Sequence, residues 1–258
     1  QYWKEEEILG KQYWEEDMEV PTEIMELDYT KSFKAFLENK TKAGNPFLFW
    51  YGGLEPHRPY SEGIGVQNGV NPDSVKVPAF LPDNSETRRD IADYLFEIEW
   101  FDKHLVNMIA LLEEKGELEN TIIIVTSDNG MPFPRAKANL YEYGTHMPLA
   151  IMWGNKIKAG RTVDDFIGAI DFAPTLLDLA GIEIPDGVTG KSFRNILESE
   201  KEGMIDNERD KIVTAIERHT YCRPAGLPYP VRAIRKGNWT YLRNFEPDRY
   251  PAGHPKFI

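Results

Sequence analysis

A long amphipathic segment between two apolar runs is the feature that most restricts the fold of this chain. From Asp83 to Lys115, apolar side chains recur at steps of three and four residues, the spacing of one face of an α-helix. Gly116 follows, and glycine commonly ends helices. The flanking runs PFLFWYGG (46–53) and TIIIVTS (121–127) are typical of buried strands. Strands alternating with helices predict an α/β domain with a mainly parallel central sheet flanked by helices.

The rest of the sequence predicts further elements of the α/β part and a second, smaller part at the end of the chain. We expect a long loop over a site at 55–82, and a helix at 28–41 with Asp28 as its N-cap. Three further elements are expected: a strand at 148–154 and helices at 170–181 and 190–199. Three short runs (210–219, 229–236 and 238–245) predict a small antiparallel sheet. We therefore predict a division into residues 1–205, an α/β part, and residues 206–258, a small antiparallel subdomain.

Composition excludes several classes of partner. The 258 residues suffice for one large domain with an appendage. The 30 basic and 42 acidic residues give a net charge of −12, which argues against nucleic acid and anionic membrane surfaces as partners. No apolar run approaches the roughly 18 residues that a membrane span needs. A single cysteine, Cys222, leaves no internal disulfide.

The sequence SDNG directly follows the second apolar run. In open α/β sheets, ligands bind at the carboxyl ends of strands, where Asp128 and Asn129 are expected. Their hard oxygens suit Ca²⁺ or Mg²⁺. Two ligands are too few, because Ca²⁺ takes roughly six to eight oxygens. On spacing alone, a tight turn at Gly130 is the better explanation of the motif.

Four blocks of the sequence resemble the sulfatases of the alkaline phosphatase superfamily and occur in that family's order. They are PFLFWYGGLEPHRPY, NTIIIVTSDNGMPFPRAKANLYEYGTHMPLAIMWG, IDFAPTLLDLAG and GVTGKSF. The second block and YPVRAIRKGNWTYLRNFEPDRYP look closest to the heparan N-sulfatase (sulfamidase) branch. The resemblance implies an alkaline phosphatase-like fold and the hydrolysis of sulfate esters or N-sulfate groups.

The resemblance also assigns roles to individual residues. Asp128 and Asn129 match two ligands of an active-site Ca²⁺, with Mg²⁺ the less favoured ion. Lys137 matches a lysine that contacts the sulfate group, and His57 a histidine that hydrogen-bonds the sulfate or the leaving oxygen. From the residues alone, Lys137 would be interpreted as a solvated surface residue, and His57 as part of a turn. The other candidates are expected to be structural: His104, Asp171 and Asp178.

The family's nucleophile is not evident. The resemblance implies a formylglycine made within a C/S-x-P-x-R motif, and a pair of adjacent aspartates, both upstream of 46–53. Cys222 lies in CRPAG, which has glycine where the motif needs arginine and lies far downstream. We therefore expect the chain to be the C-terminal part of a sulfatase that lacks its N-terminal part, and to be inactive alone.

The substrate expected from the resemblance is a sulfated sugar, such as a glycosaminoglycan fragment. Glu217, Arg218 and His219 end a predicted strand and could bind sugar hydroxyls or a second charged group. A solvated sheet edge with ordinary ion pairs is the alternative. Whether an S–N or an S–O bond is cleaved stays open.

Two other functions fit the same residues. One is a phosphoric-ester or phosphonate hydrolase of the same superfamily, and the other is a non-catalytic module that binds sulfated glycans. The resemblance implies a periplasmic, secreted or lysosomal location.

Overall fold

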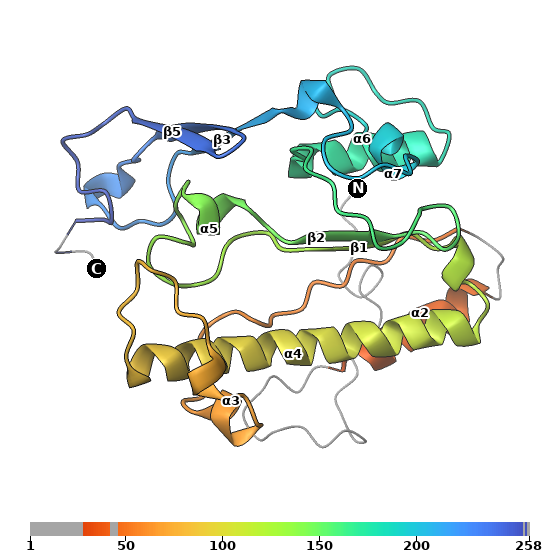
Figure 1. Cartoon of the computed structure of the whole chain (residues 1–258), viewed down its shortest axis with the longest axis horizontal. Helices are drawn as coiled ribbons and strands as arrows, with labels where there is room; N and C mark the ends of the chain where they lie inside the picture. The colour runs from red at the N-terminus through yellow and green to blue at the C-terminus, as the bar shows by residue number, and fades with distance from the viewer. Residues whose placement is uncertain (1–27, 42–45, 255, 257–258) are drawn as a thin grey trace. The chain divides into compact units, whose positions relative to one another are not determined.

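The computed structural model describes residues 28–41, 46–254 and 256, in two compact units (Figure 1). The first unit comprises residues 1–118 and the second residues 119–258. The predicted division at 205/206 falls inside the second unit and stays a prediction. Among the described residues, no helix is long and apolar enough to cross a membrane.

Helix α4 (Ser85–Glu114) is the frame of the first unit. The Asn84 side chain caps it by accepting a hydrogen bond from the Thr87 N–H at 2.9 Å. Gly116 lies just beyond the end of α4 with φ 71°, a left-handed conformation that glycine adopts without a Cβ clash. The predicted long helix is confirmed to within two residues at its N-terminus and one at its C-terminus.

Helix α2 (Tyr29–Thr41) begins as predicted, because the Lys31 N–H donates to the Asp28 carboxylate at 2.8 Å. The loop that follows segment 46–54 contains helix α3 (Ile64–Gln67) and a 3₁₀ turn, η1 (Pro72–Ser74). In Figure 1, α3 lies against α4. Ile64 of α3 packs on Phe96 and Trp100 of α4 in the core of this unit.

The prediction of a buried strand at 46–53 is wrong. The segment is extended but belongs to no sheet among the described residues. Side chains alternate along it: Phe49 packs on Phe33 of α2, with 4.7 Å between ring centroids, and Tyr51 stacks on Phe101 of α4 at 4.5 Å. Trp50, on the other face, is 79% exposed. Helices α2 and α4 therefore cover only one face of this segment.

The second unit opens with a two-stranded ladder. Strand β1 (Ile123–Thr126) pairs with β2 (Leu149–Met152), and Thr126 lies opposite Leu149. Both predicted strands are thus confirmed, but the expectation that they are buried is wrong: their residues are half-buried or exposed, because among the described residues each strand has only the other as a neighbour. Among the described residues both ladders of the protein are antiparallel, so the mainly parallel central sheet that was predicted is not observed there. The α/β class and the small C-terminal antiparallel sheet are as predicted.

Helix α6 (Phe172–Leu179) follows a 3₁₀ turn, η3 (Ala169–Asp171), close to the predicted helix at 170–181. The buried Asp171 carboxylate accepts hydrogen bonds from the Gly168 and Lys191 N–H groups and from Arg209 at 2.8–3.0 Å. Asp171 is therefore structural, as expected. These bonds use the backbone N–H of Lys191 outside a helix, so the helix predicted at 190–199 is reduced to α7 (Arg194–Leu197).

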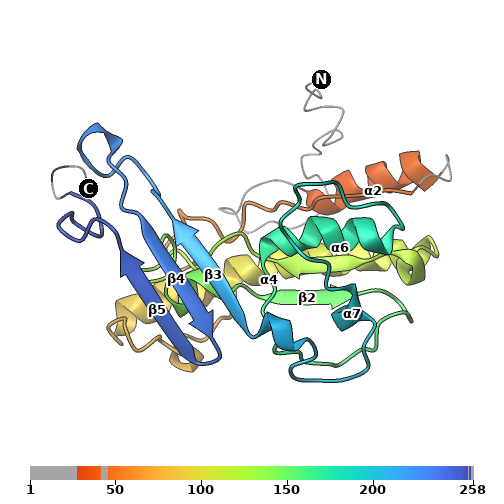
Figure 2. The ribbon, with the colours of Figure 1, turned by 90° about the horizontal axis from the view of Figure 1, so that it is seen from above.

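Strands β3 (Lys211–Ile216), β4 (Val231–Lys236) and β5 (Trp239–Asn244) form the predicted C-terminal sheet, drawn as three neighbouring arrows in Figure 2. Both pairs are antiparallel, in the order β3-β4-β5. Val231 and Ala233 are buried and pack with Leu140, which belongs to the segment after β1.

Candidate active site

The SDNG motif forms a tight turn immediately after β1. The Ser127 hydroxyl donates to the Asn129 carbonyl at 2.8 Å, and the Asn129 side-chain amide donates to the Gly130 carbonyl at 3.0 Å. The Asn129 side-chain oxygen is therefore left as an acceptor. Asp128 is exposed, and its carboxylate takes part in no ion pair within the described residues. The turn therefore carries hard side-chain oxygens at two consecutive positions.

Two glycines lock the segment after this turn. A Cβ on Gly130 would lie 1.9 Å from the Tyr143 carbonyl oxygen, and one on Gly144 would lie 2.2 Å from the Asn139 carbonyl oxygen. Both approaches are too close for any residue with a side chain. The DNG and YEYGT motifs are therefore required at these positions by direct packing of backbone on backbone.

Lys137 lies in the chain between these two glycines and is folded back on the turn. Its N–H donates to the Met131 carbonyl at 3.1 Å. Its neighbourhood is strained, since Arg135 and Ala138 have φ values of 62° and 64°, a region that side chains other than glycine rarely adopt. Within the part of the chain that the structure describes, the Lys137 ammonium forms no ion pair. The backbone thus fixes the point from which this cation projects.

The donor set at the turn fits a hard divalent cation but does not complete its coordination. Asp128 and Asn129 supply oxygens of the kind that Ca²⁺ and Mg²⁺ prefer. Among the described residues, no group of three or more histidine, cysteine, aspartate or glutamate side chains could hold a metal. Further ligands would have to come from outside this group of residues.

His57 lies in the first unit, in a loop held by its own backbone. Its N–H donates to the Leu54 carbonyl at 2.8 Å, and its Nδ1 lies 2.6 Å from the Arg58 carbonyl oxygen. The Tyr60 hydroxyl donates to the Pro56 carbonyl at 2.9 Å and closes the loop. His57 is exposed, and the contact of its ring with the Arg58 carbonyl uses Nδ1, not Nε2. Asp128, Asn129 and Lys137 belong to the second unit and His57 to the first.

Two carboxyl groups near this loop are buried: Glu55, within it, and Glu97 of α4. Glu55 is 5% exposed, and neither of its carboxylate oxygens has a hydrogen-bond partner among the described residues. Burial raises its pKa. On α4, burial, followed by the charges of Glu55 and Asp93, raises the pKa of Glu97 to about 7. The Tyr29 hydroxyl accepts from the Leu54 N–H at 3.1 Å, one residue before Glu55.

His104, by contrast, is a structural residue of α4, as expected. It is fully buried, and its Nδ1 lies 3.0 Å from the Thr30 hydroxyl. Its ring contacts the edges of Tyr29 and Trp100. Burial lowers its pKa, so the ring is held neutral.

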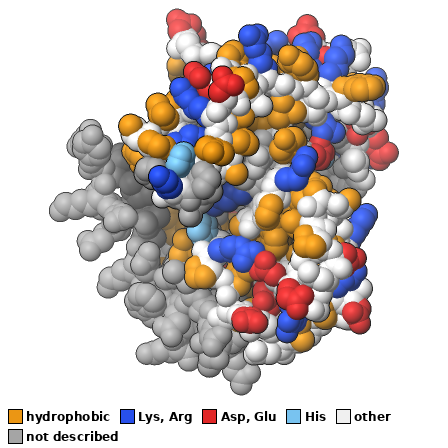
Figure 3. Space-filling view, turned by 90° about the vertical axis from the view of Figure 1, so that its left-hand side faces the viewer, with side chains coloured by type: hydrophobic (Ala, Val, Ile, Leu, Met, Phe, Trp, Pro, Cys, Tyr) orange, Lys and Arg blue, Asp and Glu red, His pale blue; other side chains and the backbone are white. Residues whose placement is uncertain are grey.

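The predicted substrate-binding residues follow the end of β3. Glu217 forms an ion pair with Arg232 of β4. Arg218 donates to the Gly226 carbonyl at 3.1 Å and covers the Tyr221 ring, while His219 is exposed. Over the face drawn in Figure 3, acidic and basic side chains are interspersed with hydrophobic ones.

Sequence reasoning missed Glu142 of α5 (Glu142–Thr145), which joins the segment after β1 to the C-terminal sheet. Its carboxylate pairs with Arg235 of β4 and lies 2.8 Å from the Nδ1 of His146. The four-residue spacing of Glu142 and His146 could have indicated half of this contact. The partner 93 positions later gives no local signal. His146 is thus an exposed partner of Glu142.

Cys222 lies in the loop between β3 and β4, where Arg223 approaches its sulfur at 3.6 Å. Arg223 itself is buried and donates to the Tyr250 and Pro251 carbonyls at 2.6–3.0 Å. This guanidinium is used for packing, which agrees with Cys222 being an ordinary loop thiol.

A sequence model of the Sulfatase family matches residues 3–182, more than half of the chain. The chain belongs to the sulfatase family. Membership implies a formylglycine nucleophile and a metal ion in general. Three curated relatives are similar over part of their length. The chain is 40% identical over 112 residues to the N-acetylglucosamine-6-O-sulfatase of Bacteroides thetaiotaomicron, covering 42% of this chain and 20% of that protein.

The second relative is human N-sulphoglucosamine sulphohydrolase, 32% identical over 140 residues, covering 50% of this chain and 28% of that protein. The third is an ulvan-active sulfatase of Formosa agariphila, 27% identical over 210 residues, covering 81% of this chain and 33% of that protein. The aligned part of the chain therefore spans a third or less of the length of these relatives.

Solved structures support the fold. The structure of BT4656 in complex with its substrate D-glucosamine-2-N,6-O-disulfate has a TM-score of 0.51 at 29% identity, covering 62% of this chain and 35% of that one. The phosphonate monoester hydrolase SpPMH of Silicibacter pomeroyi has a TM-score of 0.54 at 26% identity, covering 70% of this chain and 38% of that one. The crystal structure of yidJ from Bacteroides fragilis has a TM-score of 0.68 at 20% identity, covering 84% of this chain and 48% of that one. The fold is that of the alkaline phosphatase-like sulfatases.

Proposed function

We propose that these residues form the C-terminal part of the catalytic domain of a sulfatase that removes sulfate esters or N-sulfate groups from sulfated sugars. The observation that carries the proposal is the turn after β1, where Asp128 and Asn129 offer oxygens and Lys137 is folded back by its backbone hydrogen bond to Met131. Two relatives are named for the desulfation of N-acetylglucosamine and N-sulphoglucosamine, which supports a sulfated amino sugar as substrate.

The residues of this chain would bind the sulfate and protonate the leaving atom. The Lys137 ammonium would hold a sulfate oxygen, and Asp128 and Asn129 would hold a Ca²⁺ ion. His57 Nε2 would donate a proton to the leaving oxygen or nitrogen, which gains negative charge as its bond to sulfur lengthens. When bound, Ca²⁺ would neutralise sulfate charge, and an upstream formylglycine would supply the attacking hydroxyl.

Arg218 and His219 are the better candidates for contact with the sugar at the end of β3. Glu217 is already paired with Arg232, so its carboxylate would orient that guanidinium more than it would bind a hydroxyl. His219 is exposed and Arg218 retains further donor groups beyond its bond to Gly226. Together they suit a sugar carrying a second sulfate or a carboxylate.

A phosphonate or phosphoric monoester hydrolase is the second candidate, and the likeness to SpPMH favours it. The metal stoichiometry of the full-length protein separates the two. One Ca²⁺ per chain supports the sulfatase. Two metals per chain, with turnover of a phosphonate monoester in preference to a sulfate ester, would replace it.

The first test is the turnover of glucosamine-2-N-sulfate and N-acetylglucosamine-6-sulfate by the full-length protein that contains these residues. Peptide mapping of the same sample should find a cysteine or serine converted to formylglycine. A full-length protein with formylglycine that desulfates neither sugar would reject the substrate class, and one without formylglycine would favour the non-catalytic glycan-binding module. A periplasmic, secreted or lysosomal location belongs to the same proposal.

A further inference from the structure

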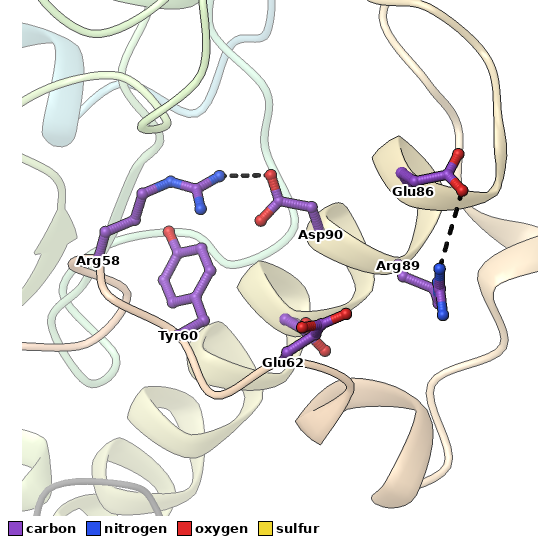
Figure 4. A pocket seen from close by; sticks show the side chains of 7 residues that line it. Arg58, Tyr60, Glu62, Glu86, Arg89 and Asp90 are labelled. Atoms are coloured by element: carbon purple, nitrogen blue, oxygen red, sulfur yellow. Dashed lines mark hydrogen bonds and ion pairs between the residues drawn. The ribbon is translucent and has the colours of Figure 1, made fainter.

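A pocket opens in the first unit, directly beside the loop that carries His57 (Figure 4). Its volume is about 250 Å³, below the range of pockets for drug-sized ligands and large enough for one small ring. Its lining comes from the loop after His57 and from the first turns of α4: Arg58, Tyr60, Glu62, Glu86, Arg89, Asp90 and Asp93.

The wall of the pocket is rigid. The Asp93 carboxylate accepts from the Gly63 N–H at 2.9 Å and the Gly65 N–H at 2.8 Å, so the loop is bonded to α4. A Cβ on Gly65 would lie 2.3 Å from the Ala92 carbonyl oxygen, which shows how closely the two backbones approach. Asp93 is 4% exposed and serves this attachment. The side chains that remain for a ligand therefore project from a fixed base.

The polar groups of the pocket include both donors and acceptors. Arg58 donates to Asp90 at 2.6 Å, as Figure 4 shows, and both side chains stay about 40% exposed. The Arg58 guanidinium also covers the Tyr60 ring, 4.7 Å from its centroid. Glu62, at the rim, forms no ion pair within the described residues. Each of these groups can still reach a ligand that enters the pocket.

The charge balance selects the kind of ligand. Four carboxylates and two guanidinium groups line the pocket, and the second guanidinium, Arg89, lies 3.9 Å from Glu86. Another sulfate or carboxylate would meet an excess of negative charge. Sugar hydroxyls meet no such penalty, because they donate to carboxylates and accept from guanidinium groups. A neutral, hydroxyl-rich ring is the chemistry that fits.

We infer that this pocket is a subsite for an unsulfated, uncharged sugar ring adjoining the sulfated one, with Glu62 and Asp90 accepting from its hydroxyls and Arg58 donating to them. Arg58, which lines the pocket, directly follows His57 in the chain, so a ring bound there would be held by the neighbour of the residue assigned to the leaving atom. The inference rests on the proposed function and adds to it the neighbouring unit of the substrate.

Binding alone gives the first test, because it needs no turnover. Saturation-transfer NMR on the full-length protein would use methyl β-glucoside as the neutral probe and methyl β-glucuronide as its anionic match. We expect the glucoside to bind, and Glu62→Ala to weaken it roughly tenfold through the loss of a charged acceptor. Glu113→Gln, an exposed glutamate near the far end of α4, is the control and should bind the glucoside as the wild type does.

Two results would overturn the inference. One is that the glucuronide binds more tightly than the glucoside and loses affinity in Arg89→Ala, which would make this an anion subsite. The other is that neither probe binds, or that Glu62→Ala binds the glucoside as well as the wild type does. Glu62 is exposed, so Glu62→Ala should fold normally, and its melting temperature checks this.

Turnover gives the second test and separates this inference from the proposed function. For a sulfated disaccharide with a neutral neighbouring ring, Glu62→Ala should raise KM about tenfold while kcat changes less than twofold. With the sulfated monosaccharide, the Glu113→Gln control should match the wild type. If the wild type turns over neither sugar, the proposed function fails, and the NMR titration still decides whether the pocket binds a neutral ring. An equal change in KM for both substrates would contradict the subsite.

Discussion

Replacing Glu97 by glutamine should make the protein more stable at alkaline pH. Glu97 is 6% exposed on α4, and its raised pKa of about 7 comes first from burial and then from Glu55 and Asp93. In the unfolded chain the same carboxyl titrates near its ordinary value of 4.5. Between these two values the folded protein binds more protons than the unfolded one, so its free energy of unfolding falls as pH rises.

The size of the effect follows from the shift in pKa. Each unit is worth about 1.4 kcal/mol, so full ionisation of Glu97 costs the fold at most about 3 kcal/mol above pH 7. Below pH 4.5 the carboxyl is neutral in both states and the penalty vanishes. Glutamine stays neutral at every pH. The difference in unfolding free energy between Glu97→Gln and the wild type should therefore be constant in acid and should grow in favour of the variant as pH rises.

The assay is urea unfolding at pH 5, 6, 7 and 8. The stability gap between Glu97→Gln and the wild type should widen by about 2–3 kcal/mol from pH 5 to pH 8. Glu99→Gln is the matched control, since Glu99 is exposed on the same helix, and its gap should stay flat. An amide that loses a hydrogen bond would shift the whole curve equally. A gap that does not grow with pH would therefore refute the burial argument.

Three further predictions concern the segment after β1. Lys137→Ala should lower kcat/KM on a sulfated sugar by about 10²–10³-fold, with a change in unfolding free energy below about 0.5 kcal/mol; equal losses in melting temperature and activity would indicate a structural lysine. Gly130→Ala should cost about 3 kcal/mol or more in chemical denaturation, because its Cβ would meet the Tyr143 carbonyl. Gly160→Ala, with open space but φ 75°, should cost only about 1–2 kcal/mol, and equal costs would contradict the packing argument. Chelation by EDTA should abolish turnover by the full-length protein, and Ca²⁺ should restore it better than Mg²⁺; an unchanged rate, or one that Asp128→Asn leaves intact, would rule out a metal at this turn.

Local patterns predicted those parts of the structure that depend on nearby residues. The N-cap at Asp28 and the extent of α4 follow from side chains within one helical turn. The turn at Asp128 likewise follows from an apolar strand that ends in a glycine-containing polar motif. In each case the residues that determine the geometry are neighbours in the chain.

The rest depends on contacts between distant residues, which have no local signature. Nothing in the sequence around Glu55 or Glu97 indicates that two acids 42 positions apart are buried together. Trp50 belongs to a continuous apolar run but is exposed, because the helices cover the opposite face of its segment. Segment 190–193 has a helical pattern but is not helical, because Asp171 and Thr175 accept hydrogen bonds from its backbone N–H groups instead.

The two glycines that lock the segment after β1 also limit how its length can vary. Gly130 packs on the backbone at Tyr143, and Gly144 on the backbone at Asn139, so both ends of this segment are fixed in position. An inserted or deleted residue between them would change the span that the chain must bridge, whereas exposed loops usually absorb such changes. Variation among relatives should therefore appear here as substitution at constant length, and engineered insertions should be placed elsewhere.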